Sequence, residues 1–250
     1  MEIVFDNVSY NKYLKDINVK FNDGIIYGVT GKNSSYIKDI LIRTINNYKG
    51  KVNKENYIIS YINSCDDTFF CTKIKDEIKF RCKLNKYNIT NIKQEVIELF
   101  YKLGIDEELY YRNTYDLSRS EIYLIKMVIG LVFNPDVIII ENIFNNIDLK
   151  YRKKIKSLIE ILVKDKIVIL FDDDPDILYD MVKSIYILKN SKIVMSGNID
   201  KVYQNEKDLV KYKILIPNLC SIVYKAREKG VKMPFRKDVR DTMKDIYRNV

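Results

Sequence analysis

Apolar and polar residues alternate at the start of the chain. The alternation runs through residues 1–10 and 15–21, as it does in antiparallel strands with one buried face. A turn signal at residues 22–24, Asn-Asp-Gly, separates these stretches from the apolar residues 25–30. The pattern therefore predicts an N-terminal antiparallel β part that leads into a further short strand.

Later in the chain the apolar residues form continuous runs and helical spacings. Residues 137–140 and 167–171 are continuous apolar runs, which are typical of parallel strands buried on both faces. Between about 73 and 133 the apolar residues recur at helical spacing. The other expected elements are a strand at 57–62, a closing hairpin formed by 184–188 and 192–195, and helices from about 198. This order predicts an α/β fold with a mostly parallel central sheet.

Composition narrows the class of protein. The net charge of +9 comes from lysines spread along the chain, and alanine occurs once, at Ala226, which indicates an AT-rich coding bias. We therefore expect no nucleic-acid partner. No apolar run approaches the length of a membrane span. The four cysteines lack CxxC spacing and the chain contains no histidine, which predicts a reduced cytoplasmic chain and no zinc site.

Three segments carry a family resemblance. Leu117 to Glu121, followed by an apolar strand that ends in Glu141-Asn142, resembles the signature helix and Walker B strand of ATP-binding-cassette (ABC) proteins. The opening, with IVFDNVSY and LKDINVKFNDGIIYGVTG, resembles the usual start of such a domain. The end, with KIVMSGNIDKVYQN and IPNLCSIVYKAREKGVKMPF, resembles the ATPase subunits of energy-coupling factor (ECF) vitamin and metal importers. The resemblance covers nearly the whole chain.

The resemblance implies a fold and an organisation. The fold is that of a P-loop NTPase, with a mostly parallel central sheet, an N-terminal antiparallel β part and a helical signature subdomain at about 73–133. The nucleotide-binding-like domain is expected to span 1–210. A helical arm is expected at 211–250, as a candidate dimerisation element. A fold does not establish activity, which depends on the residues at each motif position.

The Walker A loop departs from its pattern. It normally reads G-x-x-x-x-G-K-[ST], because glycine amides and a lysine hold the phosphates and a hydroxyl holds Mg²⁺. Gly28 and Gly31 match the start of the loop. The later glycine falls at Tyr36, the lysine at Ile37 and the hydroxyl at Lys38. Ile37 supplies no charge, so phosphate binding is expected to be lost or weak.

Several neighbouring residues could replace parts of this loop. Lys32 or Lys38 is a candidate for the missing cation, although Lys32 sits too early in the loop. Ser34 and Ser35 could offer amides to a phosphate, or one of them could cap the following helix in a plain strand–loop–helix junction. Tyr13, or else Tyr10, is the candidate for stacking on adenine.

The remaining motif positions are also altered. Asn63 falls where the family has its Q-loop glutamine, and residues 65–80 would dock on a transmembrane subunit, with Phe69, Phe70 and Ile74 as apolar anchors. Ser118 keeps the signature serine, yet with Glu121 three residues later it also fits a helix capping box. The alternative for residues 65–80 is ordinary core packing.

The catalytic positions bear on activity most directly. Glu141 could still bind Mg²⁺, since a carboxylate is a competent ligand. Asn142 replaces the general base with a neutral amide, which cannot act as a base. Asp148 matches the D-loop aspartate, which in the family works across a dimer.

The switch histidine falls at Asp173, within the acidic run 172–176. A metal site in this run is one interpretation. The other is a helix start, with Asp174 as the N-cap and Pro175 at the first helical position.

Together these positions predict a degenerate ATP-binding subunit of an ECF-type importer. It would be a non-catalytic or weakly active half of an ATPase heterodimer, with a paralogous ATPase subunit and a transmembrane coupling subunit as partners. It would lie in the cytoplasm, at the inner face of the membrane through its partner, with ATP and Mg²⁺ as doubtful cofactors. One alternative is a functional ATPase subunit with non-standard motifs. Another is a soluble regulatory protein outside transport.

Overall fold

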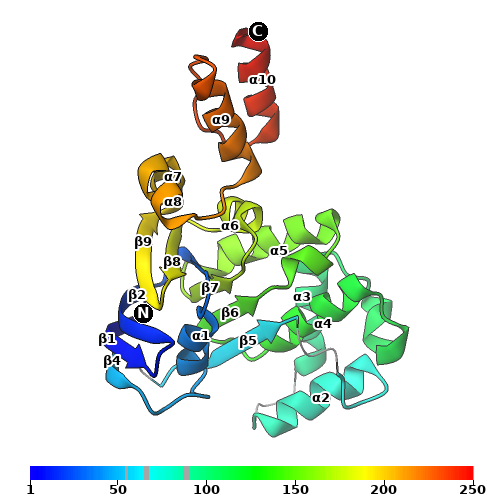
Figure 1. The fold of residues 1–250 in the computed structure, drawn as a ribbon. Helices are drawn as coiled ribbons and strands as arrows, with labels where there is room; N and C mark the ends of the chain where they lie inside the picture. Colours follow the sequence, from blue (N-terminus) through cyan, green and yellow to red (C-terminus); the bar gives the residue numbers. More distant parts are fainter. Residues whose placement is uncertain (54–55, 65–67, 87–90, 250) are drawn as a thin grey trace. The chain divides into compact units, whose positions relative to one another are not determined.

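A computed structural model describes residues 1–53, 56–64, 68–86 and 91–249. Its strands are β1 Glu2–Tyr10, β2 Leu14–Asn22, β3 Ile26–Thr30, β4 Lys49–Asn53, β5 Ile59–Asn63, β6 Val137–Glu141, β7 Ile167–Phe171, β8 Ser184–Lys189 and β9 Lys192–Asn198 (Figure 1). Its α-helices are α1 Ser35–Leu41, α2 Ile74–Leu84, α3 Ile92–Leu103, α4 Arg119–Leu131, α5 Leu149–Leu162, α6 Pro175–Met181, α7 Ile199–Gln204, α8 Glu206–Tyr212, α9 Asn218–Glu228 and α10 Val239–Asn249. Short 3₁₀ turns lie at Glu107–Tyr111, Thr114–Asp116 and Phe144–Asn146.

The chain forms two compact units. The first contains residues 1–3, 21–24 and 53–169, and the second contains 4–20, 25–52 and 170–250. The boundary after residue 169 divides β7 between them. The α/β class and the mostly parallel sheet are confirmed, since only the β8–β9 pair of the larger sheet is antiparallel among the strand pairs described.

The first unit places the β5–β6 pair beside the helical segment. β5 runs parallel to β6, and the register pairs Asn63 with Glu141. Helix α4 packs very closely on β5, because a Cβ at Gly130 would lie 2.5 Å from the Ser60 Oγ. The predicted helical region at 73–133 is confirmed, and contains α2, α3 and α4.

The second unit contains the other half of the larger sheet and most of the smaller one. β3 runs parallel to β8, and β8 pairs with β9 in the expected hairpin. A three-stranded sheet has the order β2-β1-β4, which confirms an N-terminal antiparallel part for residues 1–22. Helices α7 to α10 follow β9. Within the part of the chain that the structure describes, none of the helices combines the length and the apolar character needed to span a bilayer.

Candidate functional site

The expected site residues divide between the two units. Strand β3 and the loop after it lie in the second unit, and each keeps one glycine of the motif, Gly28 in the strand and Gly31 in the loop. Gly31 has φ +99°, and a Cβ there would lie 2.1 Å from the backbone oxygen of Leu188. A Cβ at Gly28 would lie 3.0 Å from the Leu178 Cδ2 atom. Gly31 is therefore required by the neighbouring backbone whether or not the loop binds a phosphate, whereas a side chain at Gly28 would press on the flexible Leu178 side chain.

The amides of this loop are hydrogen-bonded within the chain. The Ser34 N–H donates to the Gly31 oxygen at 3.0 Å, the Tyr36 N–H to the Asn33 oxygen at 3.2 Å, and the Ile37 N–H to the Ser34 oxygen at 3.0 Å. The Ser34 side chain makes no capping hydrogen bond to α1. Ser34 is the N-cap residue of α1, as one alternative had it, but backbone carbonyls rather than its side chain satisfy these amides.

The lysine side chains near the loop do not take the place of the motif lysine, which falls at Ile37. Ile37 is fully buried on the inner face of α1. Lys38 is largely buried, and its Nζ lies 3.4 Å from the Asp39 carboxylate. Lys32 is exposed. The loop thus presents an apolar side chain to the core at the position where the motif has its cation.

Three tyrosines gather beside the loop. The ring of Tyr36 stacks on that of Tyr13, with centroids 4.4 Å apart and an interplanar angle of 17°. The centroid of the Tyr10 ring lies 5.6 Å from that of Tyr36 and 6.2 Å from that of Tyr13. The Asn33 side-chain amide donates to the Tyr13 backbone oxygen at 3.2 Å. The sequence contains 20 tyrosines, so nothing in it singled out Tyr36 as the partner of Tyr13.

The acidic run after β7 begins a helix. Asp174 is the N-cap of α6, where it accepts the N–H of Asp176 at 2.9 Å, and Pro175 occupies the first helical position, as predicted. Asp173 accepts the Gly31 N–H at 3.4 Å and the Thr30 hydroxyl at 3.3 Å. Among the described residues, no group of acidic or cysteine side chains is arranged to hold a metal ion. The structure therefore brings Asp173 to the loop after β3.

Asp172 should make stability depend on pH. Burial raises the pKa of its carboxyl from 3.8 to about 6. The hydrogen bond from the Asp174 N–H acts in the opposite direction, but its effect is smaller. The folded protein thus holds this proton more tightly than the unfolded chain does. The protonated Asp172 carboxyl therefore contributes its full share to the free energy of unfolding below pH 3.8, and this share is lost as the pH rises through 6. Asp172→Asn lacks this titration. We expect its unfolding free energy, relative to the parent protein, to rise by about 2 kcal/mol between about pH 4 and pH 7.

Urea denaturation of both proteins at the two pH values measures this difference. The exposed Asp165→Asn change is the matched control, because it removes the same charge from a carboxyl that is not buried. A difference for Asp172→Asn that stays constant with pH would contradict the expectation.

The first unit holds the Q-loop and Walker B positions side by side. Asn63 pairs with Glu141 across β5 and β6. The Tyr61 hydroxyl donates to the Glu141 carboxylate, and the Lys126 ammonium donates to the Asn63 backbone oxygen at 3.3 Å. Asn142 follows with φ +52° and is exposed. Sequence reasoning missed Tyr61, although its alternation with Asn63 on one strand face was a usable signal.

The signature position is a helix cap. The Glu121 N–H donates to the Ser118 Oγ at 3.3 Å and the Ser118 N–H donates to the Glu121 carboxylate at 2.7 Å, so the capping box is confirmed. Burial acts to raise the pKa of Glu121, but hydrogen bonds from Ser118 and the nearby Arg112 outweigh it and lower the pKa. Ser120 was not expected to matter. It is buried and bonds to both the carboxylate and the N–H of Asp148 at 3.0 Å.

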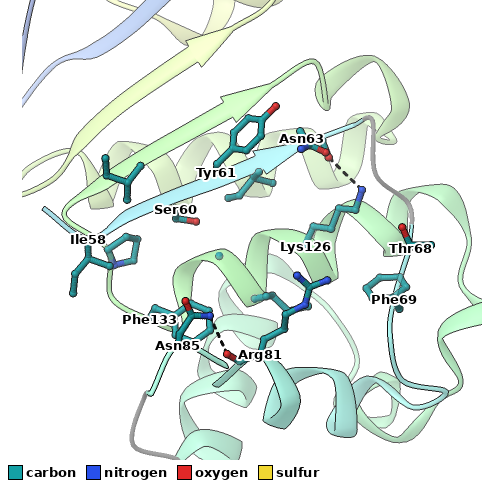
Figure 2. Close-up of a pocket in the computed structure, with 15 residues that line it drawn as sticks. Ile58, Ser60, Tyr61, Asn63, Thr68, Phe69, Arg81, Asn85, Lys126 and Phe133 are labelled. Carbon is teal, nitrogen blue, oxygen red and sulfur yellow. Dashed lines mark hydrogen bonds between the residues drawn. The ribbon is translucent and has the colours of Figure 1, made fainter. Parts of the chain in front are cut away.

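The segment expected to dock on a membrane subunit is partly core. Ile74 is fully buried, which contradicts its assignment as an apolar anchor of the docking surface and agrees with the alternative of core packing. Phe70 is 69% exposed and packs its ring under the Arg81 guanidinium at 4.8 Å. Phe69 lines a pocket of about 430 Å³ between β5, α2 and α4 (Figure 2). Residues 65–67 of this segment lie outside the described residues.

Comparison with solved structures defines the class of fold. An ATP-binding subunit of an ABC transporter superposes with a TM-score of 0.73 at 13% identity, over 85% of this chain and 100% of that one. The structure described as cbiO1 from Clostridium perfringens, part of the ABC transporter complex cbiONQ, superposes with a TM-score of 0.70 at 18% identity, over 89% and 98%. The chain therefore has the fold of an ABC ATPase domain.

Sequence similarity points to a particular group within that class. The energy-coupling factor transporter ATP-binding protein EcfA2 of Staphylococcus aureus strain USA300 is 23% identical over 261 residues, covering 92% of this chain and 91% of the relative. The corresponding protein of the bovine strain RF122 matches to the same extent. No protein-family model matches. The chain thus resembles ECF ATP-binding subunits over nearly its full length, as its motifs predicted.

Proposed function

We propose that this protein is a non-catalytic or weakly active ATPase-type subunit of an ECF-type importer. One observation carries the proposal: the position that the resemblance assigns to the phosphate-binding lysine is Ile37, whose side chain is fully buried. Similarity to ECF ATP-binding subunits over 92% of the chain supports the transporter assignment. The buried isoleucine supports the loss of activity, because an apolar side chain in the core offers no charge to a phosphate.

The residues present do not fit a bound Mg-nucleotide. The amides of Ser34, Tyr36 and Ile37 are already bonded to backbone carbonyls of the loop. The carboxylate of Glu141 accepts the Tyr61 hydroxyl, and the neutral amide of Asn142 follows it. General-base catalysis contributes about 10²–10⁴-fold in rate, so losing the base alone would leave very slow hydrolysis. The chain by itself therefore offers no set of residues for a reaction of ATP with Mg²⁺.

The pocket beside β5 is the surface that we propose for the transmembrane subunit. Arg81, Phe69 and Phe133 line it (Figure 2), and Ile62 of β5 also belongs to its lining. Glu77 stabilises the rim, since its fully buried carboxylate accepts the N–H groups of residues 70 and 71 and the Arg81 Nε. The lining mixes these apolar side chains with polar ones such as Arg81 and Asn85, so an amphipathic cytoplasmic segment of a membrane protein matches it. Membrane association would then arise through the partner.

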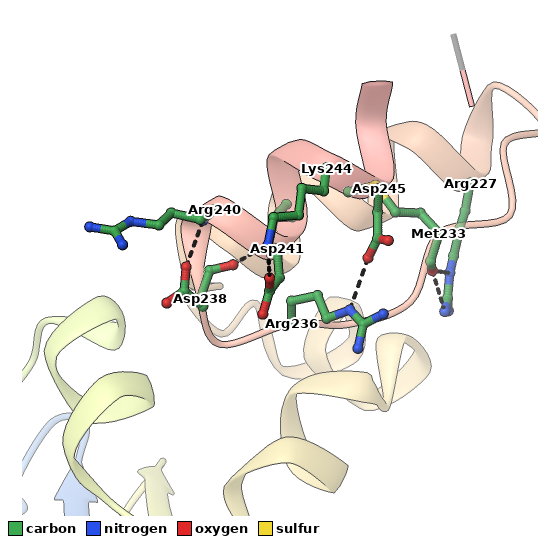
Figure 3. Close-up of polar contacts among 9 residues, drawn as sticks. Arg227, Met233, Arg236, Asp238, Arg240, Asp241, Lys244 and Asp245 are labelled. Atoms are coloured by element: carbon green, nitrogen blue, oxygen red, sulfur yellow. Dashed lines mark hydrogen bonds and ion pairs between the residues drawn. The ribbon is translucent and has the colours of Figure 1, made fainter. Parts of the chain in front are cut away.

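The C-terminal arm, residues 211–250, is the surface that we propose for pairing with a paralogous ATPase subunit. In this arm Arg227 donates two hydrogen bonds to the Met233 oxygen, and Arg236 pairs with Asp245 at 2.9 Å (Figure 3). Helix α10 turns Asp245 inward, whereas Met243 and Tyr247, four residues apart, are 42% and 76% exposed. An apolar stripe facing outward on a short helix is suited to the matching arm of a partner subunit.

Phosphate release by the purified chain tests the loss of catalysis. We expect the release rate to equal the background rate, and Glu141→Ala to leave it unchanged, because no water is activated. The exposed Glu160→Ala change is the matched control. A rate above background that falls with Glu141→Ala alone would favour the alternative of a working ATPase with non-standard motifs.

The other alternative, a regulatory protein outside transport, differs in its partners. Co-purification from the native membrane decides between them. Recovery with an integral membrane subunit and a second ATPase subunit supports the importer, and recovery as a soluble monomer contradicts it.

A further inference from the structure

We infer that the loop after β3 is a self-closed nucleotide site, in which Tyr36 covers the face expected to stack on the base and Asp173 occupies the loop as an anion. This inference rests on the proposed function and adds which side chains keep the nucleotide out. It treats Tyr36 and Asp173 as specificity-determining residues rather than as eroded positions.

Tyr36 closes the side of the site where a base would stack. Its ring is nearly parallel to that of Tyr13, with centroids 4.4 Å apart, which is the arrangement of a stacked aromatic pair. Tyr10 lies against both rings. A purine could stack on this face of Tyr13 only after displacing the Tyr36 ring. Tyr36, which stands where the motif has its later glycine, thus occupies the place where the adenine ring would stack.

Asp173 closes the side where phosphate charge would lie. Its carboxylate accepts the Gly31 N–H and the Thr30 hydroxyl at the start of the loop. Backbone N–H groups at such a loop are the donors that a phosphate would use. An incoming phosphate would meet a negative charge already bonded to these donors, and like charges disfavour each other's ionised form.

The loop after β3 connects the contact of Tyr36 with Tyr13 to the contact of Asp173 with Gly31. Asn33, with φ +77°, donates its side-chain amide to the Tyr13 backbone oxygen. Gly31, the donor to Asp173, accepts the Ser34 N–H two residues before Tyr36. One short segment therefore carries the contacts to both Tyr13 and Asp173. Binding of a whole nucleotide therefore requires changes at both ends, together with a cation in place of Ile37, whereas the phosphate end can be opened by itself.

The test is a gain of binding. The probe is a fluorescent N-methylanthraniloyl-ATP with Mg²⁺, titrated into the parent protein and into the triple variant Tyr36→Gly, Ile37→Lys, Asp173→Asn. We expect no saturable binding to the parent at millimolar concentrations, and saturable binding to the triple variant. Restoring Tyr36 or Asp173 in the variant should weaken that binding by about tenfold each, the size expected for one stacked pair or one charged contact.

Two further variants keep the outcome interpretable. Adding Tyr13→Ala to the triple variant should abolish the gain, because the stacking surface is then absent. Asp173→Asn alone, an isosteric change, should increase affinity for inorganic tripolyphosphate, whereas the exposed Asp165→Asn should not. This single variant tests the phosphate side if glycine at position 36 prevents folding.

The possible failures are distinct. If the parent and every folded variant leave both probes unbound, self-closure is wrong while the proposed function stands. If the parent itself binds the ATP probe at micromolar concentrations, the proposed loss of nucleotide binding is wrong as well. A triple variant that binds equally well with and without Tyr13 would overturn the role given to the tyrosine stack.

Discussion

Replacing Gly31 with alanine is expected to lower the free energy of unfolding by about 4 kcal/mol, a large part of the stability of a domain. Two costs add at this position. The backbone has φ +99°, which disfavours any residue with a side chain. The new Cβ would also lie 2.1 Å from the backbone oxygen of Leu188, an atom of β8 that cannot move aside.

Gly24→Ala separates these two costs. Gly24 also has a positive φ, +79°, but a Cβ added there would meet no atom within 4 Å. It should lose only about 1 kcal/mol, the conformational part. Urea denaturation of both variants measures the difference. Equal losses would show that the close approach of the Leu188 backbone adds no cost to a side chain at position 31.

Replacing Glu77 with glutamine is expected to cost about 3–5 kcal/mol, the range for breaking a buried charged pair. The carboxylate is fully buried and accepts hydrogen bonds from Phe70, Cys71 and Arg81. A glutamine has one acceptor oxygen and one donor nitrogen, so at least one of these donors would face another donor. The pocket rim next to α2 should loosen at the same time.

Thermal and urea unfolding measure the loss, with the exposed Glu98→Gln on α3 as the control that removes the same charge. Hydrogen exchange at residues 70 and 71 should accelerate in Glu77→Gln only. If both variants unfold like the parent protein, Glu77 does not stabilise the rim that we assign to docking.

Local patterns in the sequence predicted the parts of the fold that depend on local interactions. The buried strands β6 and β7, the β8–β9 hairpin and the Ser118–Glu121 capping box follow from spacings of a few residues, and all are present. Strand β4 was not predicted. Its sequence, KGKVN, has a single apolar residue and mostly exposed side chains, so it carries no alternation, and its place is set by pairing with β1.

The site was harder to predict because its contacts join distant residues. Asp173 and Gly31 are 142 positions apart, and only the folded chain shows that they are hydrogen-bonded. The two glycines that kept the Walker A pattern, Gly28 and Gly31, are ones whose Cβ atoms would contact neighbouring elements. The later glycine position holds Tyr36, whose ring packs on Tyr13 instead. Packing thus explains which glycines of the Walker A motif remain in this sequence.

Isothermal titration calorimetry of Mg-ATP into the purified chain tests the central claim most directly. With the Ile37 side chain in the core, the loop amides bonded internally and Tyr36 on Tyr13, we expect no saturable heat of binding up to millimolar nucleotide. A one-to-one isotherm with a dissociation constant in the micromolar range would contradict the account.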